Sequence, residues 1–160
     1  MKPLSFSDLT LATLARLTQF EEQEQDRAFW EALAEPLTEK EIAETQVLQE
    51  RLRRLPIMPL NEATLWARAI YPLLMLAETS RIIAWSKVSM GAATINQKTE
   101  AFGAYTVADI WTFVRAEIVL SAGAPITLRV MLSPEYAERS EAGQILKILK
   151  GIVAKQVAVE

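Results

Sequence analysis

The chain has 160 residues, a formal net charge of −3, no cysteine and no histidine. Without these two residue types it cannot form disulfides, Ser–His or Cys–His catalytic pairs, or cysteine-ligated zinc and iron–sulfur centres. A metal site would have to use oxygen ligands, which suit magnesium, manganese or calcium, and we expect no cofactor. The slightly negative charge gives no attraction to nucleic acid or to anionic membranes, so neither is expected as a partner.

The start of the sequence has no long apolar run, so it does not resemble a secretory signal. No window contains roughly 18 uninterrupted apolar residues, so no transmembrane helix is expected. We therefore predict a cytoplasmic protein with one domain, residues 1–160. Within it, a helical part (1–55) is expected to pack on, or extend from, an α+β core (60–157).

Three helices are predicted in the first half of the chain. The first starts at a cap, Ser7 or Asp8, and continues as a solvated segment through the polar run 21–26 to Pro36. Two apolar groups at helical spacing support it, Leu11, Leu14, Ala15 and Leu17 and then Phe29, Trp30 and Leu33. The second group is either a contact for a partner helix or packs onto the chain's own core.

The second helix is predicted from a capping box, Thr38 with Glu41, to Leu55. Its inward residues should be Ile42, Leu48, Leu52 and Leu55, and its last turn carries Arg51, Arg53 and Arg54, where cations complement the helix dipole. A third helix should run from a cap at Asn61 to about Ala77. Pro72 lies inside it and is expected to kink or split the helix.

The pattern after residue 80 changes to short strands. They are predicted at 82–90, 102–108, 111–120 and 126–132, and short connections favour an antiparallel meander. A final helix from about Ser140 places Ile145, Ile148, Leu149 and Ile152 on one face. The predicted fold class is thus α+β: N-terminal helices, a four-stranded antiparallel meander sheet and a C-terminal helix.

The third predicted strand has two unlike faces. Its even-numbered residues, 112–120, look like core. If it pairs with the fourth strand, the other face gathers Trp111, Phe113, Arg115, Glu117 and Arg129. Aromatic side chains beside arginines suit a binding surface, and these five residues are the binding-surface candidates. The alternative is that helices cover this face and its charges pair with one another at the rim.

Four carboxylates are the candidates for chemistry: Glu62, Glu78, Asp109 and Glu117. Two or three of them in one place would bind a hard divalent cation. Glu62 also has a simpler interpretation, as a first-turn helix residue favoured by the dipole.

Three stretches, 60–72, 102–113 and 145–150, together resemble uncharacterised bacterial proteins with the PD-(D/E)XK restriction-endonuclease-like fold. That resemblance implies a helix acid, met here only by Glu62 or Glu78, and an Asp and an acid-x-Lys triplet that hold magnesium and activate water. No lysine here has Asp or Glu two positions before it, and the nearest remnant is Asn96-Gln97-Lys98. The resemblance therefore implies a shortened relative without the catalytic motif.

The preferred hypothesis is a non-enzymatic protein-interaction or regulatory module that is homo-oligomeric or binds a protein partner. It would use the Trp111 sheet face or the N-terminal helices. The alternative is a degenerate nuclease or phosphodiesterase that depends on a divalent metal.

Overall fold

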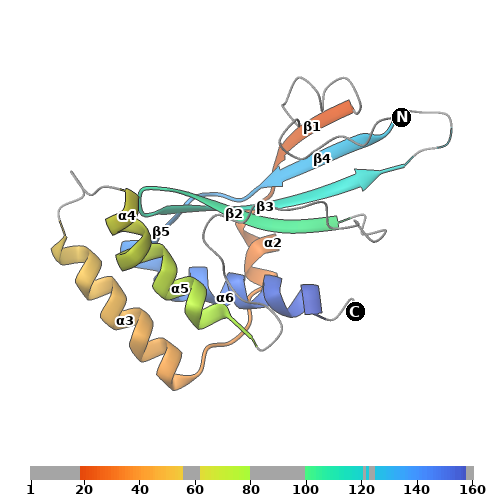
Figure 1. Ribbon diagram of the computed structural model, residues 1–160. Coiled ribbons are helices and arrows are strands. Elements are labelled where there is room, and N and C mark those ends of the chain that lie inside the picture. The colour runs from red at the N-terminus through yellow and green to blue at the C-terminus, as the bar shows by residue number, and fades with distance from the viewer. Residues whose placement is uncertain (1–18, 56–61, 80–99, 121, 123–124, 158–160) are drawn as a thin grey trace.

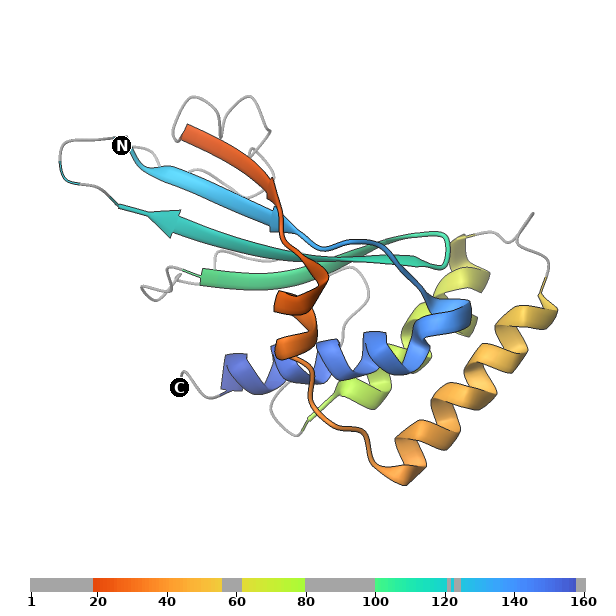
Figure 2. The same ribbon diagram turned by 180° about the vertical axis from the view of Figure 1, so that it is seen from behind.

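The computed structural model describes residues 19–55, 62–79, 100–120, 122 and 125–157. In these residues the protein is α+β, as the sequence predicts: a sheet forms one layer, and the described helices lie on one side of it (Figures 1 and 2). The first part of the predicted first helix and the strand predicted at 82–90 fall outside the described residues. None of the described helices combines the length and apolarity needed to cross a bilayer.

The sheet is mixed, which differs from the predicted four-stranded antiparallel meander. Its strand order is β1 (Gln19–Glu24), β4 (Thr127–Leu132), β3 (Ile110–Val119) and β2 (Glu100–Val107), and the short β5 (Tyr136–Ala137) also pairs with β3. β2, β3 and β4 are antiparallel neighbours, as predicted. β1 runs parallel to β4 and forms one edge (Figure 1).

The prediction that the polar run 21–26 continues a helix is wrong, because most of it belongs to β1. The backbone N–H of Gln19 donates to the Ile126 carbonyl and that of Gln25 to the Leu132 carbonyl, each at 2.8 Å. These tertiary bonds outweigh the local preference of a glutamate-rich run for helix. Charged side chains are also usual on an edge strand, where they oppose pairing with other chains.

Both α2 and α3 begin at a side-chain cap, of which only that of α3 was predicted. Asp26 caps α2 (Arg27–Ala32) by accepting from the Phe29 amide at 2.9 Å. The capping box of α3 (Glu39–Arg54) is confirmed: Thr38 accepts from the Glu41 amide at 3.3 Å, and Glu41 accepts from the Thr38 amide at 2.7 Å. The three arginines of its last turn are also where the sequence predicts them.

The inward face of α3 is only partly as predicted. Leu48 and Leu52 are buried, and Leu55 is partly buried. Ile42 is exposed, so its assignment to the core is wrong. Thr45 is buried instead, and its hydroxyl donates to the Ile42 carbonyl at 2.9 Å, which satisfies the polar group.

The interruption predicted at Pro72 takes the form of a π-helical turn just before the proline. The helix comprises α4 (Glu62–Leu65), a π-helical turn η2 (Trp66–Ile70) and α5 (Tyr71–Ala77). The Tyr71 amide donates to the Trp66 carbonyl, five residues back, as in a π-turn. A wider turn at this point accommodates a proline, which has no amide hydrogen to give to the turn before it.

The core lies between the sheet and α6 (Glu138–Val157). The apolar side of α6, buried as predicted, contacts the sheet layer on one side and α3 and α5 on the other. An aromatic cluster fills the space under β3: Trp30 of α2 stacks on Phe113 at 5.8 Å, and Tyr136 meets Phe113 edge-on at 5.6 Å. Trp30 therefore packs on the chain's own core, the second of the two interpretations of that apolar group.

Candidate functional site

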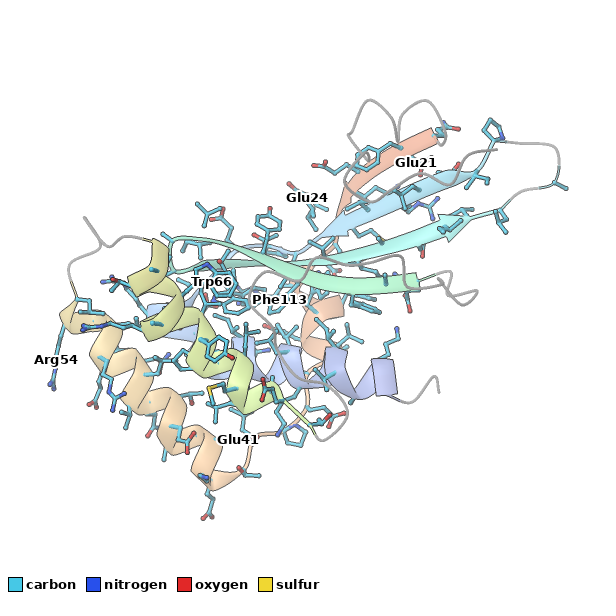
Figure 3. All side chains as sticks on the ribbon, in the orientation of Figure 1. Glu21, Glu24, Glu41, Arg54, Trp66 and Phe113 are labelled. Carbon is cyan, nitrogen blue, oxygen red and sulfur yellow. The ribbon has the colours of Figure 1, made fainter. Side chains whose placement is uncertain are left out.

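The side of the sheet that faces the helices, called the inner face, carries all five binding-surface candidates. Trp111 is 2% exposed and Phe113 is fully buried, so neither can contact a partner. Figure 3 shows Phe113 between the sheet and the helices. Of the two interpretations of this face, the structure therefore supports the second for the aromatic pair: helices cover it, with Trp30 of α2 packed on Phe113 and Glu138 of α6 hydrogen-bonded to Trp111.

The other three candidates, Arg115, Glu117 and Arg129, are only partly buried and form a row of ion pairs. Arg129 binds Glu117 at 2.7 Å and Arg115 binds Glu117 at 3.0 Å. The row extends at both ends, through Glu21 of β1, 3.1 Å from Arg129, and through Glu100 of β2, which Arg115 also binds. Lys155 of α6 ends it, 3.0 Å from Glu100.

This ion-pair row contains three acids and three bases and is neutral as a whole. Burial alone would raise the pKa of Glu100, but hydrogen bonds from Lys155 and Arg115 outweigh it and hold that pKa below its ordinary value. The hydrogen bonds that Arg129 donates to Glu117 and Glu21 raise the pKa of its guanidinium. An open cavity of about 610 Å³ lies beside the row. Because each arginine already has carboxylate partners, the row offers little unpaired positive charge to an anionic ligand.

Within each element that carries them, the residues proposed for chemistry lie far apart. Asp109 and Glu117 lie eight residues apart, just before and within β3, which is about 26 Å of extended strand. Glu62 and Glu78 lie at the two ends of the helix made of α4, η2 and α5, about 24 Å apart along its axis. Asp109 is paired with Arg139 at 2.7 Å. Among the described residues, no group of three acidic side chains is placed to hold a metal ion.

A buried carboxyl that the sequence does not single out lies at the start of α6. Glu138 is fully buried; one of its oxygens accepts from the Trp111 indole N–H at 2.8 Å, and the other has no hydrogen-bond partner among the residues that the structure describes. Burial raises the pKa of Glu138 to about 7, and the nearby Asp109 adds to this, against the hydrogen bond from Trp111. In the sequence this residue is indistinguishable from an ordinary first-turn helix acid.

An open apolar groove lies between α3 and the helix that contains Pro72. The groove there has a volume of about 590 Å³. Three of its apolar side chains are well exposed: Val47 (46%), Tyr71 (37%) and Met75 (57%). Glu44 and Arg51 of α3 lie along the same groove on either side of Val47. We call this surface the α3–α5 groove.

Sequence reasoning missed this groove, although one signal was present. Val47 and Leu48 are consecutive apolar residues, so α3 must have apolar side chains on more than one face. Leu48 is buried against the core, and Val47 is left in the groove.

The opposite, outer side of the sheet is also apolar. The even-numbered residues of 112–120 belong to it, so the prediction that this face of the third strand is core is wrong: Ile118 and Leu120 are exposed, and the helices cover the other face. The exposed large apolar residues of the described sheet and its flanks all project from the outer side by strand alternation: Phe20, Tyr105, Val107, Ile118, Leu120 and Ile126. The charged residues among its described strand positions are Glu22 and Glu24, both on β1.

No protein-family model, curated protein or solved structure matches the chain. The resemblance to restriction-endonuclease-like proteins therefore stays a prediction from the sequence, and the function has to be argued from the surfaces described above.

Proposed function

We propose that the protein is a non-enzymatic interaction module that binds an amphipathic helix in the α3–α5 groove. The observation that carries this proposal is the exposure of Val47, Tyr71 and Met75 along two adjacent helices. Grooves of this kind take the apolar side of a helix, which a partner presents at spacings of three and four residues. Isolated exposed apolar residues are ordinary, but a row of them along a groove marks a contact site.

The charges beside the groove define the chemistry of the partner. Glu44 is near one end and Arg51 near the other, separated by two helical turns, or about 10 Å. A bound helix is favoured when it places a base beside Glu44 and an acid beside Arg51. The proposal includes a cytoplasmic location, which suits a chain without cysteine. Divalent-metal chemistry is the weaker proposal, because the described Asp109 and Glu117 already pair with arginines.

The test uses a synthetic 16-residue amphipathic peptide with leucines on one face, one acidic end and one basic end. Titrated into the isotope-labelled protein, it should shift the amide resonances of Val47, Tyr71 and Met75. Val47→Lys should weaken its binding at least about tenfold, since it places a charge in an apolar groove. The control is Val107→Lys, an equally drastic change on the outer side of the sheet. Shifts confined to other surfaces, or equal effects of the two variants, would refute the proposal.

A further inference from the structure

We propose that the helix bound in the α3–α5 groove is α3 of a second copy of this chain, in a two-fold symmetric antiparallel pair. This inference rests on the proposed function and names the partner. Its starting point is that α3 itself presents the pattern that the groove requires. An apolar residue, Val47, lies between an acid, Glu44, and a base, Arg51, on the side of α3 that lines the groove.

The spacing of these charges selects the direction of the pair. Glu44 and Arg51 are placed almost symmetrically about Val47 and Leu48. When two α3 helices cross antiparallel at that point, Glu44 of each copy lies opposite Arg51 of the other. A parallel pair would instead set Glu44 against Glu44 and Arg51 against Arg51. A two-fold axis perpendicular to the helices produces the antiparallel arrangement, in which each contact occurs twice.

Both charged residues are available for such contacts. Glu44 makes one surface pair with Lys40 at 3.7 Å, and the Lys40 side chain is 84% exposed, so that pair is weak. Arg51 forms no ion pair with any residue that the structure describes, and its side chain is exposed. The neighbouring Arg53 and Arg54 are exposed too, and Figure 3 shows Arg54 at the outer end of α3.

The size of the surface sets the strength of the association. α3 has 16 residues and is about 24 Å long, and two packed helices are roughly 20 Å wide. The projected area is on the order of 500 Å² per copy, so the two copies together bury about 1,000 Å². Interfaces of that size are weak or transient, and we expect a dissociation constant in the micromolar range.

The outer side of the sheet is the competing surface for a second copy. Its described strand positions carry Glu22 and Glu24 but no basic residue. Two such faces therefore offer no charge complementarity to each other, whereas the groove does. This difference favours the groove as the surface between copies.

The experiment is sedimentation velocity of the full chain over a wide concentration range, with two charge-reversal variants. Glu44→Arg leaves only bases at the two positions and Arg51→Glu leaves only acids. Each variant alone should dimerise about ten- to thirtyfold more weakly, because both symmetry-related contacts become repulsive. An equimolar mixture should restore the dimer as a heterodimer, since every contact again joins an acid to a base. The double variant, with both changes in one chain, should also dimerise.

The matched control is Arg53→Glu, which changes the net charge by the same amount on another side of α3 and should leave the dimer intact. A wild-type chain that stays monomeric, or a dimer that survives both reversals, would overturn this inference. The peptide titration separates the two proposals: if the peptide binds in the groove and the chain is monomeric, only the identity of the partner is wrong. If neither binding nor dimerisation is seen, the proposed function fails as well.

Discussion

The two halves of the inner face of the sheet differ sharply, although the same strands build them. In the first half, Trp30 and Tyr136 pack on the buried Phe113, and the equally buried Trp111 donates a hydrogen bond to Glu138. Two residues further along β3, the same alternation presents Arg115 and then Glu117, which end in a row of ion pairs. Alternation decides which residues share a face. The helix that lies opposite decides whether that face becomes core or a charged surface.

The largest change in stability is expected from removing Trp30, the aromatic side chain that covers Phe113 on the inner face. Trp30→Ala should lower the free energy of unfolding by about 3–5 kcal/mol, because it leaves a cavity among Phe29, Phe102 and Phe113. Denaturant unfolding at neutral pH measures this loss. The control is Phe20→Ala, on the outer side of β1, which should cost less than about 1 kcal/mol. Similar losses in both variants would mean that the two sides of the sheet are equally well packed.

The second prediction is that stability depends on pH through Glu138, the buried carboxyl hydrogen-bonded to Trp111. The pKa of Glu138 is about 7 in the folded protein and 4.5 in its ordinary state, so the folded state binds the proton more tightly. Stability should therefore fall as the pH rises from about 4.5 to about 7, by up to roughly 3 kcal/mol. Glu138→Gln keeps an acceptor for Trp111 and removes the titration.

The measurement is unfolding of both proteins between pH 5 and pH 8. The variant should gain stability relative to the wild type as the pH rises, and the difference should level off above pH 7. Glu22→Gln, an exposed residue of β1, serves as the control and should show no such trend. A constant difference between Glu138→Gln and the wild type at all pH values would contradict the assignment.

A smaller loss of stability is expected when the ion-pair row, the charged half of the inner face, is disrupted. Glu117→Ala leaves Arg115 and Arg129 without the carboxylate they share. Because the row is partly exposed to solvent, the cost should be about 1 kcal/mol at low ionic strength and should shrink in about 1 M salt. Unfolding at the two salt concentrations tests this. A loss that salt does not change would show that Glu117 acts through packing, as the aromatic half does.

The smallest effect should come from an isolated surface pair. Lys40→Ala removes the contact with Glu44 at 3.7 Å and should change stability by less than about 0.5 kcal/mol. This variant gives the baseline against which the ion-pair row is judged. If the two losses are equal, the row has no cooperative character.

The sequence was most informative where local chemistry decides the structure. The capping box at Thr38 and the apolar stripe of α6 depend on neighbours in the chain, and both were predicted. The alternation of β3 was predicted too, but its faces were assigned the wrong way round: Phe113 lies in the core, and Ile118 and Leu120 are exposed. β1 was missed because its hydrogen bonds go to β4, more than 100 residues away. The groove was missed for a similar reason: it exists only where α3 and α5 lie side by side.

At the candidate site, too, features that depend on contacts between distant parts of the chain could not be predicted from the sequence. Grouping Arg115, Glu117 and Arg129 on one face was possible from alternation alone, and the structure brings the three together. Whether Trp111 is open or covered was left as two alternatives, because the answer depends on where α2 and α6 pack. Glu138 was not identified either, because a buried helix acid and an exposed one have the same local sequence pattern.

The glycine at position 151 has a consequence for recognising relatives of this protein. The segment that joins α2 to α3 passes so close to α6 that a β-carbon at Gly151 would lie 1.7 Å from the Leu33 carbonyl oxygen. The Glu35 amide donates to the Lys147 carbonyl one turn earlier, and Lys150 binds Glu41 at 2.8 Å, so the segment is held in place on both sides. Any chain that keeps this crossing must keep a glycine there. In an alignment of distant candidates, that one column would separate true members of the fold from chains that share only its helical pattern.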